Sequence, residues 1–326
     1  MRILLSCNHE YPSYKPNGSG KEITKFPSGS NHHQHDLLAR GLAEKGHEVY
    51  YFVNHTADAI SDPGVHLVST LIDDVDIVHL NARINEEVYR YYKSKSVSVI
   101  ATNHLYVANE IPPFKWVHVS KTTADLYQEK HYVWCGLDPE DYIYKEQKDD
   151  YYLFIANITR YLEKGLDIAF KITQKLNKKL VVAGSSKNPS DIAIVENLCN
   201  KFNVTYVGDV RGSEKAKLLA NAKALFSPSK LPETFGITLI EALFSGTPVI
   251  CSNNGAYGEI ISKDVGFVCE TESDYINAFK NIDAIKSSTC RSYAMNNFHY
   301  LKTTEKYLKI YNEILMSKKQ INELNF

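Results

Sequence analysis

The sequence predicts an α/β protein of two domains, each built around a parallel sheet. Three observations predict this. At 326 residues, the chain is long for one hydrophobic core and suits two α/β domains of ordinary size. In both halves, strand-like apolar runs alternate with helical segments, which is the order found in parallel sheets. A charged stretch without periodicity separates the two halves.

The first half shows short apolar runs with amphipathic segments between them. Its predicted strands cover residues 3–7, 49–53, 77–80 and 97–101, and its predicted helices cover about 31–45 and 86–93. Each helix falls between two strands along the chain, so the strands are expected to pair in parallel.

The second half repeats this alternation. Its predicted strands cover residues 151–156, 180–183, 205–207, 224–226 and 247–252, and its main predicted helices cover about 166–176, 190–202, 214–220, 257–262 and 307–318. Because the two halves share one pattern, we expect two Rossmann-like domains. Ligands of such sheets bind beyond the carboxyl ends of the strands.

A polar segment over residues 136–141, followed by the charged run 145–150, is interpreted as the linker between the domains. The predicted boundaries are 1–143 for the first domain and 144–304 for the second. Residues 305–326 are expected to form a C-terminal helix.

Composition excludes several classes of protein. The formal net charge is −1, so a general nucleic-acid partner is not expected. No apolar run approaches the ~20 residues that a membrane span needs, and the first residues are too soon polar for a signal peptide. The six cysteines are dispersed, which favours reduced, buried thiols and a cytoplasmic protein. They are Cys7, Cys135, Cys199, Cys251, Cys269 and Cys290.

The most informative segment follows the predicted strand 224–226. Glu233 precedes a turn at Phe235-Gly236, where a loop becomes a helix, and Glu241 lies near the end of the first helical turn. The unpaired N–H groups and the positive dipole end of such a helix can receive a phosphate. Two carboxylates beside it can accept hydrogen bonds from hydroxyls of a sugar or a ribose. The segment therefore suggests a site for a sugar nucleotide.

The same residues also allow a structural interpretation. Thr238-x-x-Glu241 fits a capping box, in which Glu241 would bond to the start of the helix. Glu233 has no such role, and a carboxylate beside an apolar helix needs a partner. Both interpretations of Glu241 stay open from the residues alone.

This segment resembles the E-x7-E signature of family 4 of the retaining glycosyltransferases. The spacing of Glu233 and Glu241, the Phe-Gly pair between them and the run Gly-Thr-Pro-Val-Ile at 246–250 all match. The resemblance spans nearly the whole chain and implies the GT-B fold, with an acceptor domain and a nucleotide-sugar donor domain facing each other across a cleft. It implies that the C-terminal helix returns to the first domain. It also implies that Glu233 contacts the transferred sugar and Glu241 the ribose, with the sugar and phosphates on the backbone of Phe235, Gly236, Ile237 and Thr238.

A loop after the predicted strand 151–156 carries two cations, Arg160 and Lys164. Two positive charges beyond a strand end can neutralise a diphosphate and stabilise its departure. The family usually shows Gly-Arg and then Lys-Gly here. By resemblance, Lys164 holds the diphosphate, Arg160 stands in for the missing arginine, and Asn157, at the arginine's place, lies in the donor site. A solvated loop is the alternative.

A second loop of small residues, including Gly29-Ser30, leads from the first predicted strand into a helix. Such a loop can bind an anion. The family has two glycines here, and Ser30 replaces the second. By resemblance Gly29 and Ser30 belong to the donor site, and a flexible surface loop is the alternative.

His104 follows a predicted strand as the last residue of Thr102-Asn103-His104. The pattern matches a Thr-x-His of the family, in which the histidine lies near the transferred sugar. An imidazole there could hold a hydroxyl or share developing charge. A structural histidine is the alternative.

Two further patterns suggest metal sites but are interpreted otherwise. His32, His33 and His35 have no local carboxylate or cysteine to complete a ligand set, so a solvated helix start is expected. The acidic pattern at 74–76 imitates the D-x-D of metal-dependent GT-A glycosyltransferases, but it is interpreted as the start of an ordinary strand. No metal site is predicted.

Together these observations predict a hexosyltransferase that moves a sugar from a nucleotide sugar, with UDP- or GDP-sugars favoured, to a hydroxyl of a glycan or small-molecule acceptor. Retention of configuration and independence of metals and other cofactors are expected. The predicted catalytic residues are Glu233, His104, Lys164 and Arg160. A GT-B epimerase or phosphorylase and an inactive sugar-nucleotide-binding protein stay open as alternatives. Peripheral contact with a membrane is a further alternative without support in the sequence.

Overall fold

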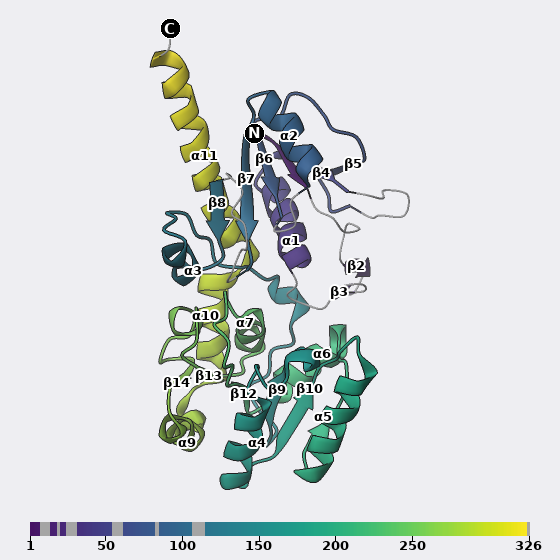
Figure 1. The fold of residues 1–326 in the computed structure, drawn as a ribbon, viewed down its shortest axis with the longest axis vertical. Helices are drawn as coiled ribbons and strands as arrows, with labels where there is room; N and C mark the ends of the chain where they lie inside the picture. Colours follow the sequence, from purple (N-terminus) through teal and green to yellow (C-terminus); the bar gives the residue numbers. More distant parts are fainter. Residues whose placement is uncertain are drawn as a thin grey trace. The chain divides into compact units, whose positions relative to one another are not determined.

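The structure is a computed structural model that describes residues 1–6, 14–17, 20–23, 31–53, 61–81, 85–105 and 115–324. The chain divides into two compact units (Figure 1). The first comprises Met1–Asp138 and Phe298–Phe326, and the second comprises Pro139–Asn297.

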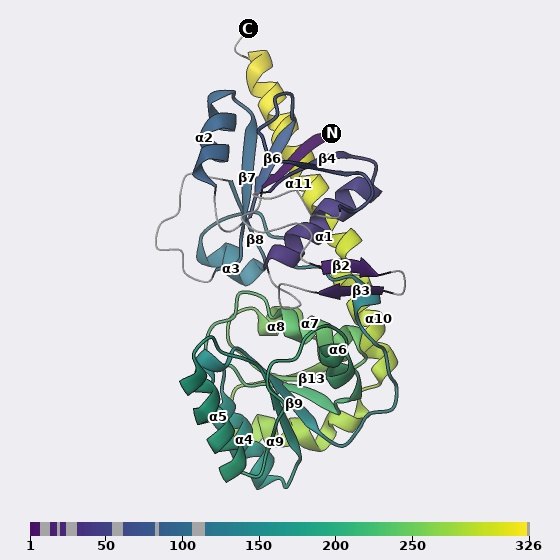
Figure 2. The same cartoon turned by 90° about the vertical axis from the view of Figure 1, so that its right-hand side faces the viewer.

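The first unit contains a six-stranded sheet in the order β5-β4-β1-β6-β7-β8, with every neighbouring pair parallel. Its strands are β1 Arg2–Ser6, β4 Glu48–Phe52, β5 Val65–Val68, β6 Ile77–Leu80, β7 Ser98–Asn103 and β8 Lys115–His118. Its helices are α1 Asn31–Glu44, α2 Glu86–Ser94, α3 Lys121–Leu126 and α11 Tyr300–Leu324. A separate antiparallel pair consists of β2 Tyr14–Asn17 and β3 Gly20–Ile23 (Figure 2).

Both faces of the first sheet are covered, because successive side chains of a strand point to opposite faces. Ile3 and Leu5 of β1 belong to one apolar cluster, which also contains residues of α1 and α11. Leu4 belongs to another, which contains Val88 and Tyr92 of α2. The C-terminal helix, yellow in Figure 1, packs beside α1 and is thereby part of this core.

The second unit contains a six-stranded sheet in the order β11-β10-β9-β12-β13-β14, again with every pair parallel. Its strands are β9 Tyr152–Ile155, β10 Leu180–Ala183, β11 Thr205–Tyr206, β12 Ala224–Ser227, β13 Val249–Ser252 and β14 Gly266–Cys269. Its helices are α4 Leu166–Lys175, α5 Pro189–Lys201, α6 Gly212–Asn221, α7 Ile237–Phe244, α8 Tyr257–Ile260, α9 Glu272–Asn281 and α10 Ser287–Phe298. Short 3-10 helices are η1 Pro139–Asp141, η2 Ile158–Arg160 and η3 Ile282–Ala284.

Aromatic rings fill the core of the second unit. Tyr152 of β9 stacks on Phe279 of α9, with ring centroids 4.1 Å apart, and Phe226 of β12 meets Phe279 edge to face. Such pairs stabilise a core beyond the area that they bury. The central strands β9 and β12 are therefore firmly held where their carboxyl ends carry the loops described below.

The predicted alternation is present in both units, and the structure adds strands and a helix that the sequence did not predict: β2, β3, β5, β8, β14 and α3. The chain leaves the first unit at Asp138, earlier than the expected boundary, because Leu137 pairs with the segment that returns. Its N–H bonds to the Phe298 carbonyl at 2.8 Å, and its carbonyl accepts from the Tyr300 N–H at 3.1 Å.

The cysteine prediction holds for the described residues. Cys135, Cys199, Cys251, Cys269 and Cys290 are free and buried. Cys7 lies outside the described residues.

Candidate functional site

The candidate site lies in the second unit, at the carboxyl edge of its sheet. The first strand of this unit, β9, lies between β10 and β12. The chain runs from β9 to β10 on one side and from β12 to β13 on the other, so the strand order reverses between β9 and β12. In open α/β sheets this switch point is where ligands bind. The segments that follow β9, β12 and β13 supply Lys164, Glu233 and Gly255.

The backbone of Glu233 is held by the segment after β13. The Glu233 N–H donates to the Asn254 carbonyl at 3.3 Å, and the Ala256 N–H donates to the Glu233 carbonyl at 2.8 Å. Gly255 lies between these bonds, and a Cβ at its position would fall 2.2 Å from the Glu233 carbonyl oxygen. Only glycine allows the two segments to approach this closely.

The Glu233 carboxylate receives two donors on the same oxygen. Lys164 Nζ lies 2.6 Å from Oε1, and the Ser229 hydroxyl donates to Oε1 at 2.7 Å. The side chains of Lys164 and Glu233 are 24% and 16% exposed, so the pair is partly accessible to solvent. The structure thus brings together two of the predicted catalytic residues, and it adds Ser229, to which the sequence analysis gave no role.

Lys164 is placed by the end of its loop. Its N–H donates to the Arg160 carbonyl at 2.8 Å, and the next residue, Gly165, is the N-cap of helix α4 with a φ of 83°. A Cβ at Gly165 would lie 2.0 Å from the Pro228 carbonyl oxygen. The loop after β9 therefore packs closely against the loop after β12, one residue before Ser229.

Arg160 also lies near this carboxylate, although it binds elsewhere. Its Nε donates to Glu163 at 2.6 Å, and both side chains are half exposed. The bond to Glu163 raises the pKa of Arg160, with the charge of Glu233 contributing. Asn157 caps η2, since its side-chain oxygen accepts from the Thr159 N–H at 3.0 Å.

Helix α7 begins at Ile237, with Gly236 as its N-cap residue at a φ of 106°. The capping-box alternative is wrong, because Thr238 lies inside the first turn and not at the cap. The N-cap residue is a glycine and supplies no side-chain hydrogen bond to this helix start. Its first N–H groups, with the positive end of the dipole, can therefore accept an anion.

Glu241 has a different environment from Glu233. Its side chain is fully buried, its Oε2 lies 2.6 Å from Lys215 Nζ, and its Oε1 accepts from the Tyr142 hydroxyl at 3.1 Å. Lys215 lies on α6 and Tyr142 follows η1. No local pattern in the sequence connects either residue with Glu241.

In the first unit, His104 follows strand β7 by one residue. Burial lowers its pKa to about 4, with the charge of His32 contributing, so the imidazole is neutral at neutral pH. Gly29 and Ser30, the other donor-site residues expected from this half, lie outside the described residues.

The predicted solvated helix start at His32, His33 and His35 is wrong for two of the three. His33 and His35 are buried, and the His35 ring packs edge to face on His79 with centroids 5.1 Å apart. Burial extends around most of α1, where Asp36, Leu37 and Arg40 are also buried.

The acidic pattern at 74–76 precedes β6, as expected, and the Arg2 N–H donates to Asp76 at 2.7 Å. In the described ranges, no group of three or more His, Cys, Asp or Glu residues could hold a metal ion.

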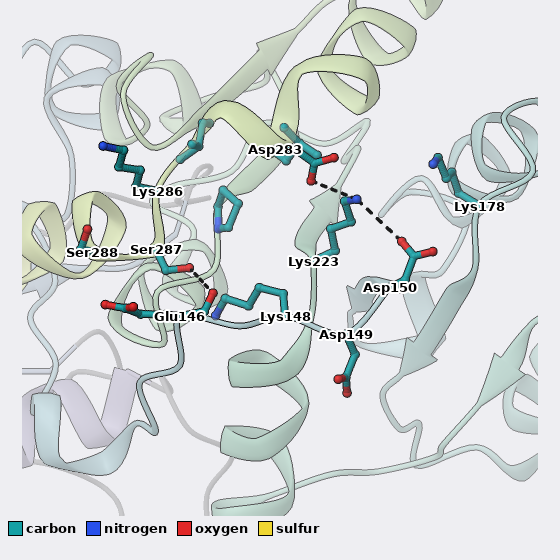
Figure 3. A pocket seen from close by; sticks show the side chains of 13 residues that line it. Glu146, Lys148, Asp149, Asp150, Lys178, Lys223, Asp283, Lys286, Ser287 and Ser288 are labelled. Carbon is teal, nitrogen blue, oxygen red and sulfur yellow. Dashed lines mark hydrogen bonds and ion pairs between the residues drawn. The ribbon is translucent and has the colours of Figure 1, made fainter.

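A pocket of about 710 Å³ also lies on the second unit, but at the opposite edge of the sheet (Figure 3). Lys223 immediately precedes β12, and Pro248 immediately precedes β13. Figure 3 shows Lys223 between Asp150 and Asp283, at 3.7 and 2.9 Å. Its cationic charge is thus already compensated by carboxylates.

Lys148 lines the same pocket, and its ammonium is fully engaged in hydrogen bonds within the protein. Its ammonium donates to the carbonyls of Ala220 and Ser245 and to the Thr247 hydroxyl, at 2.8, 3.0 and 2.9 Å. Burial lowers the pKa of Lys148 to about 8. This lysine holds the segment before β9 against the ends of α6 and α7, so we assign the pocket no part in the candidate site.

Comparison with known proteins places the candidate site in a recognised family segment. Residues 141–297, just under half of the chain, match the family model of group 1 glycosyl transferases. The chain is 31% identical to the uncharacterized glycosyltransferase MJ1607 of Methanocaldococcus jannaschii, over 44% of this chain and 38% of that protein. It is 27% identical to the O-antigen chain mannosyltransferase RfbU of Salmonella typhimurium, over 51% and 47%. The chain therefore matches less than half the length of these curated relatives.

Solved structures match over nearly the whole chain. The glycosyltransferase AviGT4, involved in avilamycin A biosynthesis, gives a TM-score of 0.74 at 21% identity, covering 97% of this chain and 98% of that one. Sucrose-phosphate synthase from Thermosynechococcus elongatus gives 0.73 at 15% identity, covering 97% and 100%. Anabaena Alr3699/HepE, solved with UDP and glucose, gives 0.65 at 11% identity, covering 95% and 99%. These matches confirm the predicted GT-B fold. Within the described residues, no helix combines the length and apolar character needed to cross a membrane.

Proposed function

We propose that this chain is a glycosyltransferase that moves a sugar from a nucleotide sugar to an acceptor hydroxyl. The observation that carries the proposal is the Lys164–Glu233 pair at the switch point of the second sheet, beside the start of α7, whose N-cap residue is a glycine. This constellation lies inside the segment that matches the group 1 glycosyl transferases.

The donor diphosphate would bind at the start of α7, with Lys164 and Arg160 beside it. The charge that must be stabilised during glycosyl transfer develops on this leaving group, and preorganised N–H groups and cations stabilise it. The donor-side contacts expected at Phe235, Gly236, Ile237 and Thr238 belong to this part of the proposal.

Glu233 would accept hydrogen bonds from hydroxyls of the transferred sugar, because its carboxylate is fixed and partly exposed. Neutral His104 of the first unit is proposed to contact the same sugar as a hydrogen-bonding imidazole. Gly29, Ser30 and Asn157 are proposed as further donor contacts.

Glu241 is proposed to hold the ribose, as the resemblance implies. In this structure its carboxylate is paired with Lys215 and Tyr142 and shielded from solvent. Ribose binding would therefore require Glu241 to share one oxygen with a hydroxyl while it keeps its cation.

Retention of configuration and independence of metals are part of the proposal. Lysine, arginine and a helix dipole can neutralise a diphosphate as a divalent cation does elsewhere. UDP- and GDP-sugars are the favoured donors. HepE binds UDP and glucose, and RfbU is named a mannosyltransferase of O-antigen chains. A glycan or a small molecule would be the acceptor.

The test is thermal unfolding of the chain with saturating UDP, GDP, ADP, CMP or NAD, each with and without EDTA. A ligand at a hundred times its Kd stabilises the folded state by about 2.7 kcal/mol. We expect one nucleoside diphosphate to raise the melting temperature, with no effect of EDTA. Lys164→Ala should abolish the shift, whereas Lys230→Ala, which removes an exposed partner of Asp167, should not.

No shift with any nucleotide would contradict the donor site. A shift that EDTA removes would contradict independence of metals. Release of the nucleoside diphosphate should require an acceptor, and release or sugar epimerisation without one would favour another enzyme of this fold.

A further inference from the structure

The Glu233 carboxylate depends on two donors of different character. Lys164 has a flexible stem and is partly exposed, whereas Ser229 is 1% exposed and short. Both bind the same atom, Oε1, at 2.6 and 2.7 Å. In the described part of the chain, no donor to Glu233 Oε2 is found within hydrogen-bond distance.

Ser229 is itself fixed from two sides. Its carbonyl accepts from the Ser252 hydroxyl at 2.7 Å and from the Asn254 side chain at 2.6 Å. Its hydroxyl oxygen accepts from the Leu231 N–H at 3.2 Å. A hydroxyl has one hydrogen to donate. The Glu233 carboxylate is charged and lies 2.7 Å from the hydroxyl, whereas the Leu231 carbonyl is neutral and lies 3.3 Å away. The hydroxyl therefore donates its hydrogen to Glu233.

A donor diphosphate would compete with Glu233 for Lys164. The phosphate oxygens carry more charge than one carboxylate, and the long stem of lysine lets its ammonium move toward them. When Lys164 moves, Glu233 Oε1 loses one of its two donors. Ser229 remains, because its carbonyl is held by Ser252 and Asn254 on the side of β13 and its hydroxyl by the Leu231 N–H.

We propose that Ser229 is a positioning residue, which keeps the Glu233 carboxylate oriented toward the transferred sugar when the donor diphosphate draws Lys164 away. This inference rests on the proposed function. The two hydrogen-bond donors of Glu233 thus have separate roles. Lys164 binds the phosphates of the nucleotide sugar, and Ser229 orients Glu233, which contacts the transferred sugar.

The experiment compares two ligands that differ only by the sugar. Calorimetric Kd values are measured for UDP and UDP-glucose, and for GDP and GDP-mannose, with the unmodified chain and with Ser229→Ala. The pair that binds the unmodified chain is used. Loss of an ordinary intramolecular hydrogen bond corresponds to about a three- to tenfold change in affinity where ligand binding depends on that bond. We expect a loss of affinity of that size for the nucleotide sugar in S229A, with a change of less than about twofold for the nucleoside diphosphate.

Ser252→Ala is the matched control. It deletes a buried hydroxyl that bonds to the Ser229 carbonyl and leaves the Glu233 carboxylate untouched. Both variants should lose stability, but only S229A should lower the ratio of sugar-nucleotide to nucleotide affinity. If Ser229 had only a structural role, S229A would weaken binding of the nucleotide and of the nucleotide sugar by the same factor. S229A and Ser252→Ala would then show the same ratio of the two affinities.

The outcomes separate the two proposals. If no nucleoside diphosphate binds the unmodified chain, the proposed function fails and the role of Ser229 fails with it. If both ligands bind and S229A keeps the original affinity ratio, the role of Ser229 is wrong while the proposed function stands.

Discussion

At the scale of single residues, the two glutamates of one short segment occupy opposite environments. Glu233 has one carboxylate oxygen held by a lysine and a serine and remains partly exposed. Glu241 is buried beside Lys215, whose side chain is only 9% exposed. A buried ion pair contributes little net stability, but removing one partner leaves an uncompensated charge. The two positions should therefore respond differently to the loss of their charge.

Glu241→Gln is predicted to destabilise the second unit by about 3 kcal/mol, because Lys215 would lose its counter-charge in the interior. Urea unfolding followed by circular dichroism measures the change. Glu163→Gln is the control, since its pair with Arg160 is half exposed and should leave the midpoint nearly unchanged. Equal midpoints for E241Q and the unmodified chain would show that the buried pair is replaceable.

Buried His79 predicts a dependence of stability on pH. Its Nδ1 lies 2.7 Å from the Tyr311 hydroxyl, its Nε2 lies 2.7 Å from the Thr102 hydroxyl, and burial lowers its pKa to about 3. Below a pH of about 6.5, the ordinary histidine pKa, His79 binds a proton in the unfolded chain but stays neutral in the folded chain. The unfolding free energy should therefore fall as pH falls, by up to about 1.4 kcal/mol per pH unit from this residue.

The measurement is urea unfolding at pH 7, 6 and 5, followed by tryptophan fluorescence. Both tryptophans of the chain, Trp116 and Trp134, lie in the first unit, so the signal reports on the unit that contains His79. His79→Gln should give a shallower dependence on pH than the unmodified chain. Parallel curves for the two proteins would contradict a neutral His79 in the folded state.

At the scale of elements, the sequence predicts helices and strands that show a regular local pattern of apolar residues. It does not predict edge strands or contacts between segments far apart in the chain. The buried central strands and most long helices agree with the prediction within a few residues, whereas α11 begins seven residues before the predicted 307–318 and ends six residues after it. Strand β5, Val-His-Leu-Val, and strand β8, Lys-Trp-Val-His, are short edge segments with polar positions, so they lack the apolar run that marks a buried strand. Lys164 and Glu233 are 69 residues apart, and only the fold brings them into contact.

The contact between the loops after β9 and β12 depends on one backbone position. Gly165→Ala combines an unfavourable positive φ with a Cβ 2.0 Å from the Pro228 carbonyl, and we expect a loss of about 3 kcal/mol. Gly208 is the matched control in the same unit, because its φ is +73° with no atom within 4 Å of an added Cβ. G208A should cost only about 1 kcal/mol. Urea unfolding compares the two variants, and equal losses would show that the loops can separate without strain.

At the scale of the whole molecule, the two units differ in how the chain builds them. The second unit is continuous, from Pro139 to Asn297, and has its own aromatic core. The first unit needs both ends of the chain, because Tyr307, Ile310, Tyr311 and Ile314 of α11 belong to its core. The alternation of strands and helices predicted two sheets, but it could not predict that the last helix completes the first core. That contact joins segments at opposite ends of the sequence.

This asymmetry predicts the behaviour of fragments. Residues 139–297 alone should fold with a cooperative urea transition in circular dichroism. Residues 1–138 alone should not, since burial of four large side chains from α11 supplies roughly 8 kcal/mol, comparable with the stability of a domain. Joining residue 138 to residue 298 by a short glycine linker should restore folding, because Leu137 and Phe298 already share a hydrogen bond of 2.8 Å. Cooperative unfolding of 1–138 without 298–326, followed by tryptophan fluorescence, would show that α11 only covers a core that the rest of the unit forms by itself.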